Sequence, residues 1–246
     1  MARAIYLLFG VVAYLIFFAT FLYLIAFVGD LPFVPRTVDR GGGLPLGPAI
    51  VVDLGLIALF GLQHSIMARQ GFKTAWTRIV PRPIERSTFV LFASLALIAM
   101  FAFWQPLPAM VWEVGDRAGT LALQVAFAAG WLLVLISTFL ISHFELFGLK
   151  QVWGHARGTA AAPPEFRQPL FYRLVRHPIY SGFFIAFWAT PRMTQGHLLL
   201  AVGMSIYMLI AIRLEERDLV RMFGRDYEDY RGRAGMLIPR LTRRRT

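Results

Sequence analysis

Four long apolar segments constrain the fold of this chain more than any other feature of its sequence. They cover residues 4 to 28, 49 to 68, 87 to 104 and 118 to 142, and each is close to the roughly 20 residues that a helix needs to cross a bilayer. Backbone groups in hydrocarbon must be paired within the segment, which favours helices. With 57% hydrophobic and 16% charged residues, the sequence predicts an all-α integral membrane protein.

Two shorter apolar segments follow, at 178 to 190 and 197 to 212, on either side of the sequence TPRMTQGH. The Pro and Gly between them predict a break between two helices, so we expect a helical hairpin over 178 to 212. Neither arm is expected to span about 30 Å comfortably at about 1.5 Å per residue. The predicted architecture is four full transmembrane helices plus this short C-terminal hairpin, which gives five or six apolar segments.

Loop charges predict the orientation. Loops 69 to 86 and 143 to 177 and the tail from Arg213 are rich in Arg and Lys, whereas loops 29 to 47 and 105 to 117 carry only three such residues between them. By the positive-inside rule, the basic loops and both termini face the cytoplasm. The first apolar segment is longer than the apolar core of a typical signal peptide, so we expect it to remain as the first span.

The external loop after the third span contains QPLPAMVWEV. We expect this segment to lie in the membrane interface, with Trp104 and Trp112 as aromatic anchors.

The composition excludes several kinds of chemistry. The 246 residues contain no Cys, which excludes disulfides, Fe–S clusters, thiolate zinc sites and thiol nucleophiles. His143 and His155 are twelve positions apart and no HExxH pattern occurs, so we expect no metal site. The net charge of +11 comes from basic residues at the ends of apolar segments, a pattern typical of topology signals and anionic-lipid contacts. We therefore expect the lipid bilayer, and not nucleic acid, as the partner.

The C-terminal part of the chain contains a dense set of polar residues, YRLVRHPIYSG before the hairpin and RLEERDLVRMFGRDYEDY after it. Ionisable side chains beside hydrocarbon are costly, so this cluster predicts a functional site. Pro178 fits the first turn of a helix and places Arg176 and His177 at its N-terminus, which favours a carboxylate or phosphate. Gly182 allows close approach to the backbone. The alternative is a capped helix with an interfacial Tyr180.

Two adjacent carboxylates, Glu215 and Glu216, follow Arg213 at the cytoplasmic end of the last apolar segment. Acidic groups near a helix C-terminus oppose the macrodipole, so a ligand with hydroxyls or an ammonium group would explain their position. The alternative is a solvated helix face with an i, i+4 network, in which Glu216 and Arg217 have Arg221 within reach.

Aromatic residues at helical spacing follow the two carboxylates. Phe223, Tyr227 and Tyr230 form a stripe, which can close over the hairpin or lie on the bilayer. We favour packing as its role. The next residues, GMLIPRL, are expected to form a strap across the cytoplasmic mouth.

Three further polar patches lie at the cytoplasmic ends of apolar segments. They comprise Gln63, His64 and Ser65, then Glu85, Arg86 and Ser87, and finally His143 and Glu145. A lone intramembrane histidine is more often a hydrogen-bonded structural residue than a ligand, but three patches at one level indicate a lined pocket.

The pattern RHPxYxG, a hairpin and then RxEExxLxxxFGxxYxxY, over Tyr172 to Tyr230, resembles the signature of integral membrane methyltransferases of the isoprenylcysteine carboxyl methyltransferase and phospholipid methyltransferase type. The segments LQHSIMAR, PRPIERSTFVL, ISHFELFGLKQVW and TPRMTQGHLLLA are similar to bacterial methanethiol S-methyltransferases, which make dimethyl sulfide from methanethiol with S-adenosyl-L-methionine. The resemblance implies one methyltransferase domain over 1 to 246, in a bacterial inner membrane. Its membrane part would be 1 to 142 and its cofactor-binding part 143 to 246.

The resemblance also implies a cofactor site for S-adenosyl-L-methionine. Matched motif positions place it at Tyr172, His177, Pro178, Ile179, Tyr180 and Glu215, with Glu165 to Arg167 as a weaker match; Arg176, Gly182 and Glu216 join it by the arguments above. The family's carboxyl methyltransferases have an Arg four residues before the first matched Glu, where this chain has Ala211. This departure argues against an isoprenylcysteine-like substrate and fits a small thiol in a narrow, dry pocket.

The reaction implied is direct in-line methyl transfer from a sulfonium to a thiolate, for which alignment and exclusion of water are the main requirements. An aliphatic thiol is mostly protonated near pH 7, so a nearby base should help. His64 and His143 are the candidates for that base, and Arg176 for binding the cofactor's carboxylate. The predicted substrate pocket comprises Gln63, Ser65, Glu145 and Arg213.

Two alternatives to this interpretation remain open. The chain could methylate an isoprenoid or lipid acceptor that enters between helices, or it could be a non-catalytic membrane assembly factor or small transporter. Transport is disfavoured because the sequence has no inverted repeat and no matching pair of broken spans.

Overall fold

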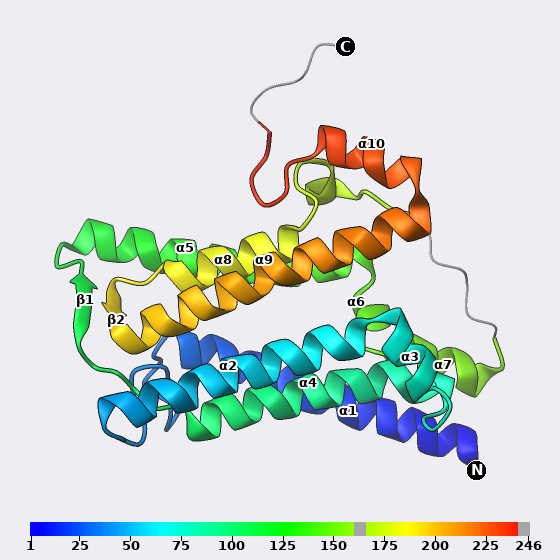
Figure 1. The fold of residues 1–246 in the computed structure, drawn as a ribbon, viewed down its shortest axis with the longest axis horizontal. Helices are drawn as coiled ribbons and strands as arrows, with labels where there is room; N and C mark the ends of the chain where they lie inside the picture. Colours follow the sequence, from blue (N-terminus) through cyan, green and yellow to red (C-terminus); the bar gives the residue numbers. More distant parts are fainter. Residues whose placement is uncertain (160–165, 241–246) are drawn as a thin grey trace. The chain divides into compact units, whose positions relative to one another are not determined.

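A computed structural model describes residues 1–159 and 166–240 of the chain. In this part of the chain, five helices are long and apolar enough to cross a membrane: α1 (Ala2–Val28), α2 (Leu46–Ala68), α4 (Arg82–Phe103), α5 (Arg117–Ile141) and α9 (Gln195–Phe223) (Figure 1). The predicted all-α integral membrane architecture is therefore confirmed.

The remaining elements are short. They are α3 (Gln70–Trp76), α6 (His143–Leu146), α7 (Leu149–Arg157), the 3-10 helix η1 (Leu170–Arg173), α8 (Pro178–Trp188), α10 (Arg225–Arg233) and the strands β1 (Met110–Glu113) and β2 (Arg192–Thr194).

The C-terminal hairpin consists of α8 and α9, and its second arm is longer than the sequence predicted. Helix α8 begins at Pro178, as expected, and has 11 residues. Helix α9 has 29 residues because it continues past Ile212 through Arg, Glu and Leu, which are good helix formers. It stops where Gly224 adopts a positive φ of 55°. The apolar segment ends at Ile212, but residues that favour a helix continue beyond it.

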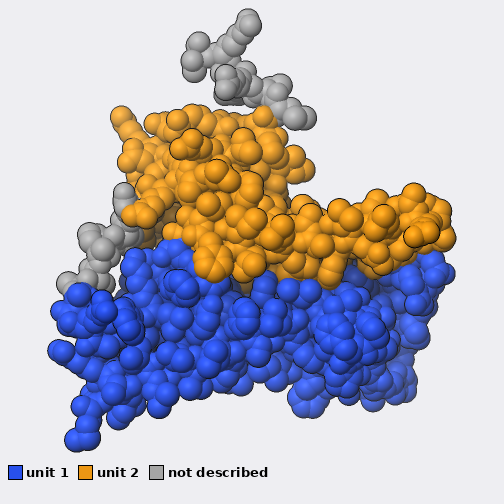
Figure 2. All heavy atoms as spheres, turned by 180° about the vertical axis from the view of Figure 1, so that it is seen from behind, with its two compact units in different colours: residues 1–113, 142–163, 192–203 blue, residues 114–141, 164–191, 204–246 orange. Residues whose placement is uncertain are grey.

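The chain forms two compact units that alternate along the sequence (Figure 2). Unit 1 comprises residues 1–113, 142–163 and 192–203, and unit 2 comprises residues 114–141, 164–191 and 204–246.

At one end of unit 1, three chain segments are joined by hydrogen bonds. Strands β1 and β2 pair antiparallel, with Met110 opposite Thr194, and the Thr194 hydroxyl donates to Asp39 Oδ1 at 2.5 Å. The Gly196 amide donates to the Leu107 carbonyl at 3.1 Å. The two loops with few basic residues, after α1 and after α4, therefore lie at the same end of unit 1 as β2.

The prediction that Trp104 is an interfacial anchor is wrong. Its side chain is buried, and its indole N–H donates to the Val38 carbonyl at 3.1 Å. Part of the following segment forms β1 and is paired with β2. The apolar flank of Trp104 made it look like a membrane anchor, but its indole is satisfied inside the protein.

At the other end of unit 1, the basic segments come together. Arg86, at the start of α4, donates through Nε to the Leu146 carbonyl at 2.6 Å. Gly148 adopts a positive φ of 89°, and a Cβ there would lie 2.5 Å from the Ser87 hydroxyl. Helix α7 also packs on α1, where Val152 fills the space beside Gly10. This end contains the predicted patches on α2, α4 and α6.

Unit 2 is centred on the close packing of α5 against α8. A Cβ on Gly182 would lie 2.6 Å from the Gly130 carbonyl oxygen, and a Cβ on Gly130 would lie 2.8 Å from the Gly182 carbonyl oxygen. Small residues at a membrane helix crossing allow such close backbone approach. Gly182 was predicted to admit a ligand, but the group lying against it is the backbone of α5.

Candidate functional site

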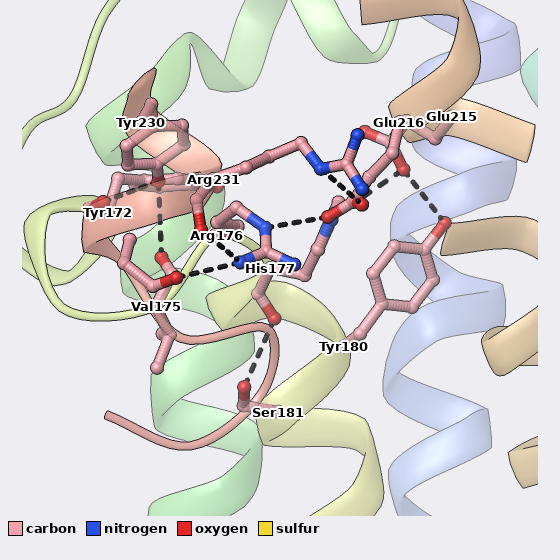
Figure 3. Close-up of polar contacts among 11 residues, drawn as sticks. Tyr172, Val175, Arg176, His177, Tyr180, Ser181, Glu215, Glu216, Tyr230 and Arg231 are labelled. Carbon is pink, nitrogen blue, oxygen red and sulfur yellow. Dashed lines mark hydrogen bonds and ion pairs between the residues drawn. The ribbon is translucent and has the colours of Figure 1, made fainter. Parts of the chain in front are cut away.

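The polar cluster predicted from the C-terminal motifs is assembled in unit 2, where the N-terminus of α8 meets the charged part of α9 (Figure 3). Its centre is Glu216. Oε1 of Glu216 lies 2.6 Å from Nε of Arg176 and 3.1 Å from Nε2 of His177. Oε2 lies 3.3 Å from Nε of Arg231. The Arg176 and Glu216 side chains are only 9% and 11% exposed, so this is a largely buried ion-pair network.

The network also answers the alternative that Glu216 belongs to a solvated helix face. Arg221, the partner expected in that case, lies 3.7 Å from Asp218. Arg176 adds hydrogen bonds from its Nη1 to the carbonyls of Ala234 at 2.7 Å and Arg231 at 3.3 Å. Glu216 and Arg176 therefore join α8, α9 and the segment after α10.

Glu215 has a different environment from its neighbour. Its Oε2 accepts a hydrogen bond from the Tyr180 hydroxyl at 3.3 Å and lies 4.0 Å from His177 Nδ1. The Glu215 side chain is 44% exposed. Tyr180 and Glu215 face one another, as Figure 3 shows, and the carboxylate of Glu215 retains capacity for further donors.

The segment after α10 forms the predicted strap. The amides of Arg176 and His177 donate to the carbonyls of Gly235 and Met236 at 2.8 Å and 3.2 Å. The Ser181 hydroxyl donates to the Leu237 carbonyl at 2.7 Å. Since His177 is the N-cap of α8 and its side chain makes no capping bond, the strap supplies the partners that fix this helix start.

The aromatic stripe packs, as predicted. Tyr227 and Tyr230 are buried and contact Phe166 and Phe223. The Tyr230 hydroxyl donates to the Tyr172 carbonyl at 2.5 Å. Of the weaker match at 165 to 167, only its last two residues lie within the described part of the chain.

Burial keeps the phenols of this cluster neutral. It raises the pKa of Tyr230 to about 12 and raises the pKa of Tyr172 and Tyr227 further above the usual value, with nearby Glu215 adding to both shifts. Neutral phenols act as hydrogen-bond donors. The Tyr172 hydroxyl donates to the Ser137 carbonyl at 3.3 Å, whereas the buried Tyr227 hydroxyl has no partner among the described residues.

The candidate bases lie in unit 1. His143 is buried, and its Nε2 lies 2.9 Å from the Tyr14 hydroxyl. Burial lowers the pKa of His143 below its usual value, which favours the neutral imidazole that a base requires. The centroid of the His64 ring lies 4.8 Å from the centroid of the Phe89 ring and 5.4 Å from that of the Phe60 ring.

The residues predicted to line a substrate pocket have dissimilar surroundings. Gln63 Nε2 lies 3.1 Å from the Met67 sulfur, and the Ser65 carbonyl accepts from Arg69 at 3.1 Å. The Glu145 side chain is 47% exposed and pairs with Lys150 at 2.6 Å. Arg213 belongs to unit 2 and is exposed on α9.

Sequence reasoning missed two participants. Tyr14 contacts His143 from 129 positions away, and Arg231 pairs with Glu216 across α10 and α9. Neither residue belongs to a motif, and a contact at such separation leaves no signal in local spacing.

Five long apolar helices and a buried network of Arg, His and Glu define an integral membrane protein with a polar site at the end of its C-terminal helical hairpin. The chain belongs to the methanethiol S-methyltransferase family. It is 54% identical to "Methanethiol S-methyltransferase 1" of Bradyrhizobium diazoefficiens over 94% of this chain and 81% of that protein. It is 52% identical to "Methanethiol S-methyltransferase" of Mycobacterium tuberculosis over 97% of this chain and 98% of that protein.

A more distant relative is "Nurim" of Homo sapiens, which is 33% identical over 68% of this chain and 66% of that protein. No family model matches the sequence. No solved structure matches it.

Proposed function

We propose that this protein is an enzyme that transfers a methyl group from S-adenosyl-L-methionine to methanethiol, giving dimethyl sulfide. The observation that carries this proposal is the near-full-length similarity to proteins named methanethiol S-methyltransferase, at 46 to 54% identity for four of them. The alternative of a lipid or isoprenoid acceptor has no comparable support.

The described residues of unit 2 fit the cofactor. The cofactor supplies a methyl group on a positively charged sulfonium, and its amino and ribose groups donate hydrogen bonds. Glu215 offers a half-exposed carboxylate beside the Tyr180 hydroxyl, and the buried Tyr227 hydroxyl lacks a partner among the described residues. A carboxylate favours a cationic ligand, and a buried unpaired hydroxyl favours any ligand that satisfies it. We propose that Tyr180, Glu215 and the start of α8 hold the cofactor.

The substrate must lose a proton during the reaction. The bond between methyl and sulfonium sulfur breaks as the bond between methyl and thiol sulfur forms, and the thiol proton passes to a base. We propose His143 or His64 as that base, since burial lowers the pKa of His143 and so favours the neutral imidazole, which is the form that accepts a proton.

The direct test is headspace gas chromatography of purified protein supplied with S-adenosyl-L-methionine and methanethiol. Dimethyl sulfide is expected, with S-adenosylhomocysteine formed in equal amount. Release of S-adenosylhomocysteine only when lipid or isoprenoid is supplied would favour the other acceptor class. Failure to bind labelled S-adenosyl-L-methionine would reject methyl transfer altogether.

The cofactor site has its own test. Glu215→Ala should remain folded and lose cofactor affinity in calorimetry, because the exposed carboxylate is removed while the Glu216 network stays intact. Asp218→Ala, which removes another carboxylate of α9 with a 38% exposed side chain, should bind normally. Equal affinity of Glu215→Ala and wild type would contradict the assignment.

The base is tested by pH. If His143 accepts the thiol proton, activity of His143→Ala should recover at high pH, where the thiol ionises unaided. The same measurement on His64→Ala decides between the two histidines. A loss that is uniform at every pH would reject that role for the residue concerned.

We also propose that the protein lies in a bacterial inner membrane with both termini in the cytoplasm. The support is that the two loops with few basic residues meet at one end of unit 1 and the basic segments at the other. A reporter active only in the cytoplasm should be active when fused after residue 246 and inactive when inserted at residues 41–43. The reverse pattern would invert the topology.

A further inference from the structure

A hollow of about 460 Å³ lies in unit 2 beside the charged end of α9. Its lining is mostly cationic: Arg213, Arg217, Arg221 and Arg231, together with Glu216 and Val220. Glu216 is already engaged by Arg176 and His177 and also pairs with Arg231, and Arg221 pairs with Asp218. The excess positive charge of the hollow therefore comes from Arg213 and Arg217.

The arginines are placed along one face of α9. Arg213, Arg217 and Arg221 recur every four residues, so they lie one above another on the helix surface. Among the residues that the structure describes, neither Arg213 nor Arg217 forms an ion pair with a carboxylate. Like charges at this spacing repel one another, and a bound anion would relieve that repulsion.

The same helix face is apolar before the arginines begin. Ile206 and Ile210 are 55% and 48% exposed, and their spacing to Arg213 and Arg217 places all four on one face. Since α9 is long and apolar enough to span a membrane, this face changes from Ile, which suits hydrocarbon, to Arg, which suits the boundary of a bilayer.

We propose that this face of α9 is a binding site for one anionic phospholipid, with its phosphate in the arginine-lined hollow and an acyl chain along Ile206 and Ile210. Guanidinium groups suit phosphate oxygens because they offer paired donors in a fixed fork. Basic pockets on the cytoplasmic side of transmembrane helices are known to suit anionic headgroups. A soluble anion would use the arginines but not the apolar stripe, so the stripe favours a lipid as the occupant.

The hollow adjoins the proposed cofactor site through Glu216, but the lipid proposal does not depend on cofactor binding. Glu216 lies between them, with Oε1 on Arg176 and His177 and with Oε2 on Arg231 at the hollow. Lipid binding is therefore measured without any methyl transfer.

The experiment compares the full-length chain, purified in neutral detergent, with two triple variants of equal charge. The variant Arg213→Gln/Arg217→Gln/Arg221→Gln removes the three positive charges on this face of α9. Arg3→Gln/Arg78→Gln/Arg82→Gln removes three exposed arginines from the basic segments of unit 1. Each is titrated with dioctanoyl-phosphatidylglycerol, with dioctanoyl-phosphatidylcholine and with inorganic phosphate, and the unfolding midpoint is followed by intrinsic fluorescence. Native mass spectrometry counts the bound lipids.

Phosphatidylglycerol is expected to raise the midpoint of the wild type and of the unit 1 variant, and to bind the α9 variant at least tenfold more weakly. Phosphatidylcholine should have little effect. Equal weakening in both triple variants would overturn the proposal, since general surface charge would explain it. An equal effect of inorganic phosphate at matched concentration would also overturn it, because the acyl chain would be irrelevant.

Two single variants test the same site if the α9 triple variant does not fold. Arg217→Gln alone should weaken phosphatidylglycerol binding several-fold. Ile206→Ser should weaken phosphatidylglycerol while leaving the weak response to inorganic phosphate unchanged. Unchanged lipid binding in both variants would reject the site.

Discussion

Glu215 and Glu216 are adjacent in the sequence, and their surroundings predict opposite consequences when each is changed to Ala. Glu216→Ala removes the shared partner of a largely buried Arg176 and His177. Glu215→Ala removes a half-exposed carboxylate that accepts one hydrogen bond from Tyr180. The first change should markedly lower the stability of the folded protein, and the second should leave its stability nearly unchanged.

The structure gives the approximate size of each effect. Removing one partner of a buried ion pair costs about 3–5 kcal/mol, because the other charge is left without compensation. Arg176 keeps its bonds to two backbone carbonyls, which favours the lower end, near about 3 kcal/mol. The contribution of Arg231 is small since its side chain is 47% exposed. For Glu215, solvent screening limits the loss to about 0–1 kcal/mol.

Thermal unfolding in detergent, followed by intrinsic fluorescence, distinguishes the two variants. For a chain of this size, about 3 kcal/mol corresponds to a midpoint lowered by roughly 6–12 °C, while Glu215→Ala should lie within about 4 °C of the wild type. Scan rate is held constant because membrane proteins commonly unfold irreversibly. If the two midpoints fall equally, or if Glu215→Ala falls further, the assignment of separate structural and ligand-binding roles is refuted.

Three further outcomes are expected. Gly182→Ala should destabilise the protein by about 1–3 kcal/mol, because its Cβ would lie 2.6 Å from a backbone oxygen of α5. Gly232→Ala should not destabilise it, because nothing lies within 4 Å of a Cβ at that position. Equal unfolding midpoints of the two variants would contradict the close packing of α5 and α8. Tyr230→Phe should lower stability by about 1–3 kcal/mol by leaving the Tyr172 carbonyl without its 2.5 Å donor, and an unchanged midpoint would show that the bond contributes little. If His143 is the base, the acid limb of activity should lie below its usual pKa of 6.5, since the neutral form accepts the proton and burial extends its range to lower pH; a limb above that value would count against it.

Much of the membrane architecture could be predicted because it depends on local properties of the sequence. Apolar runs gave the four early spans, and Pro178 gave the start of α8. The spacing of Tyr227 and Tyr230 predicted a packed face, which the structure confirms. Each of these features is determined by residues within a turn or two of one another.

The features that could not be predicted depend on partners far away in the sequence. The pairing of β1 with β2 joins Met110 to Thr194, and strands of three or four residues leave little periodicity to detect. Trp104 had the flanks of an interfacial anchor, yet its partner is Val38. The length of α9 was underestimated because hydropathy, which reports the membrane boundary, does not report the end of the helix.

The two carboxylates together account for how a cationic ligand would be accommodated beside an Arg-rich surface. Glu216 compensates the charge of Arg176 and holds His177 at the start of α8, so the cation nearest the helix N-terminus is not available to repel a ligand. Glu215 then remains as the carboxylate with exposed surface in the network. Its loss should weaken a cationic sulfonium ligand more than the neutral thioether product that remains after methyl transfer, because only the former gains from the negative charge. Comparable weakening of both ligands in Glu215→Gln would mean that Glu215 acts by hydrogen bonding alone.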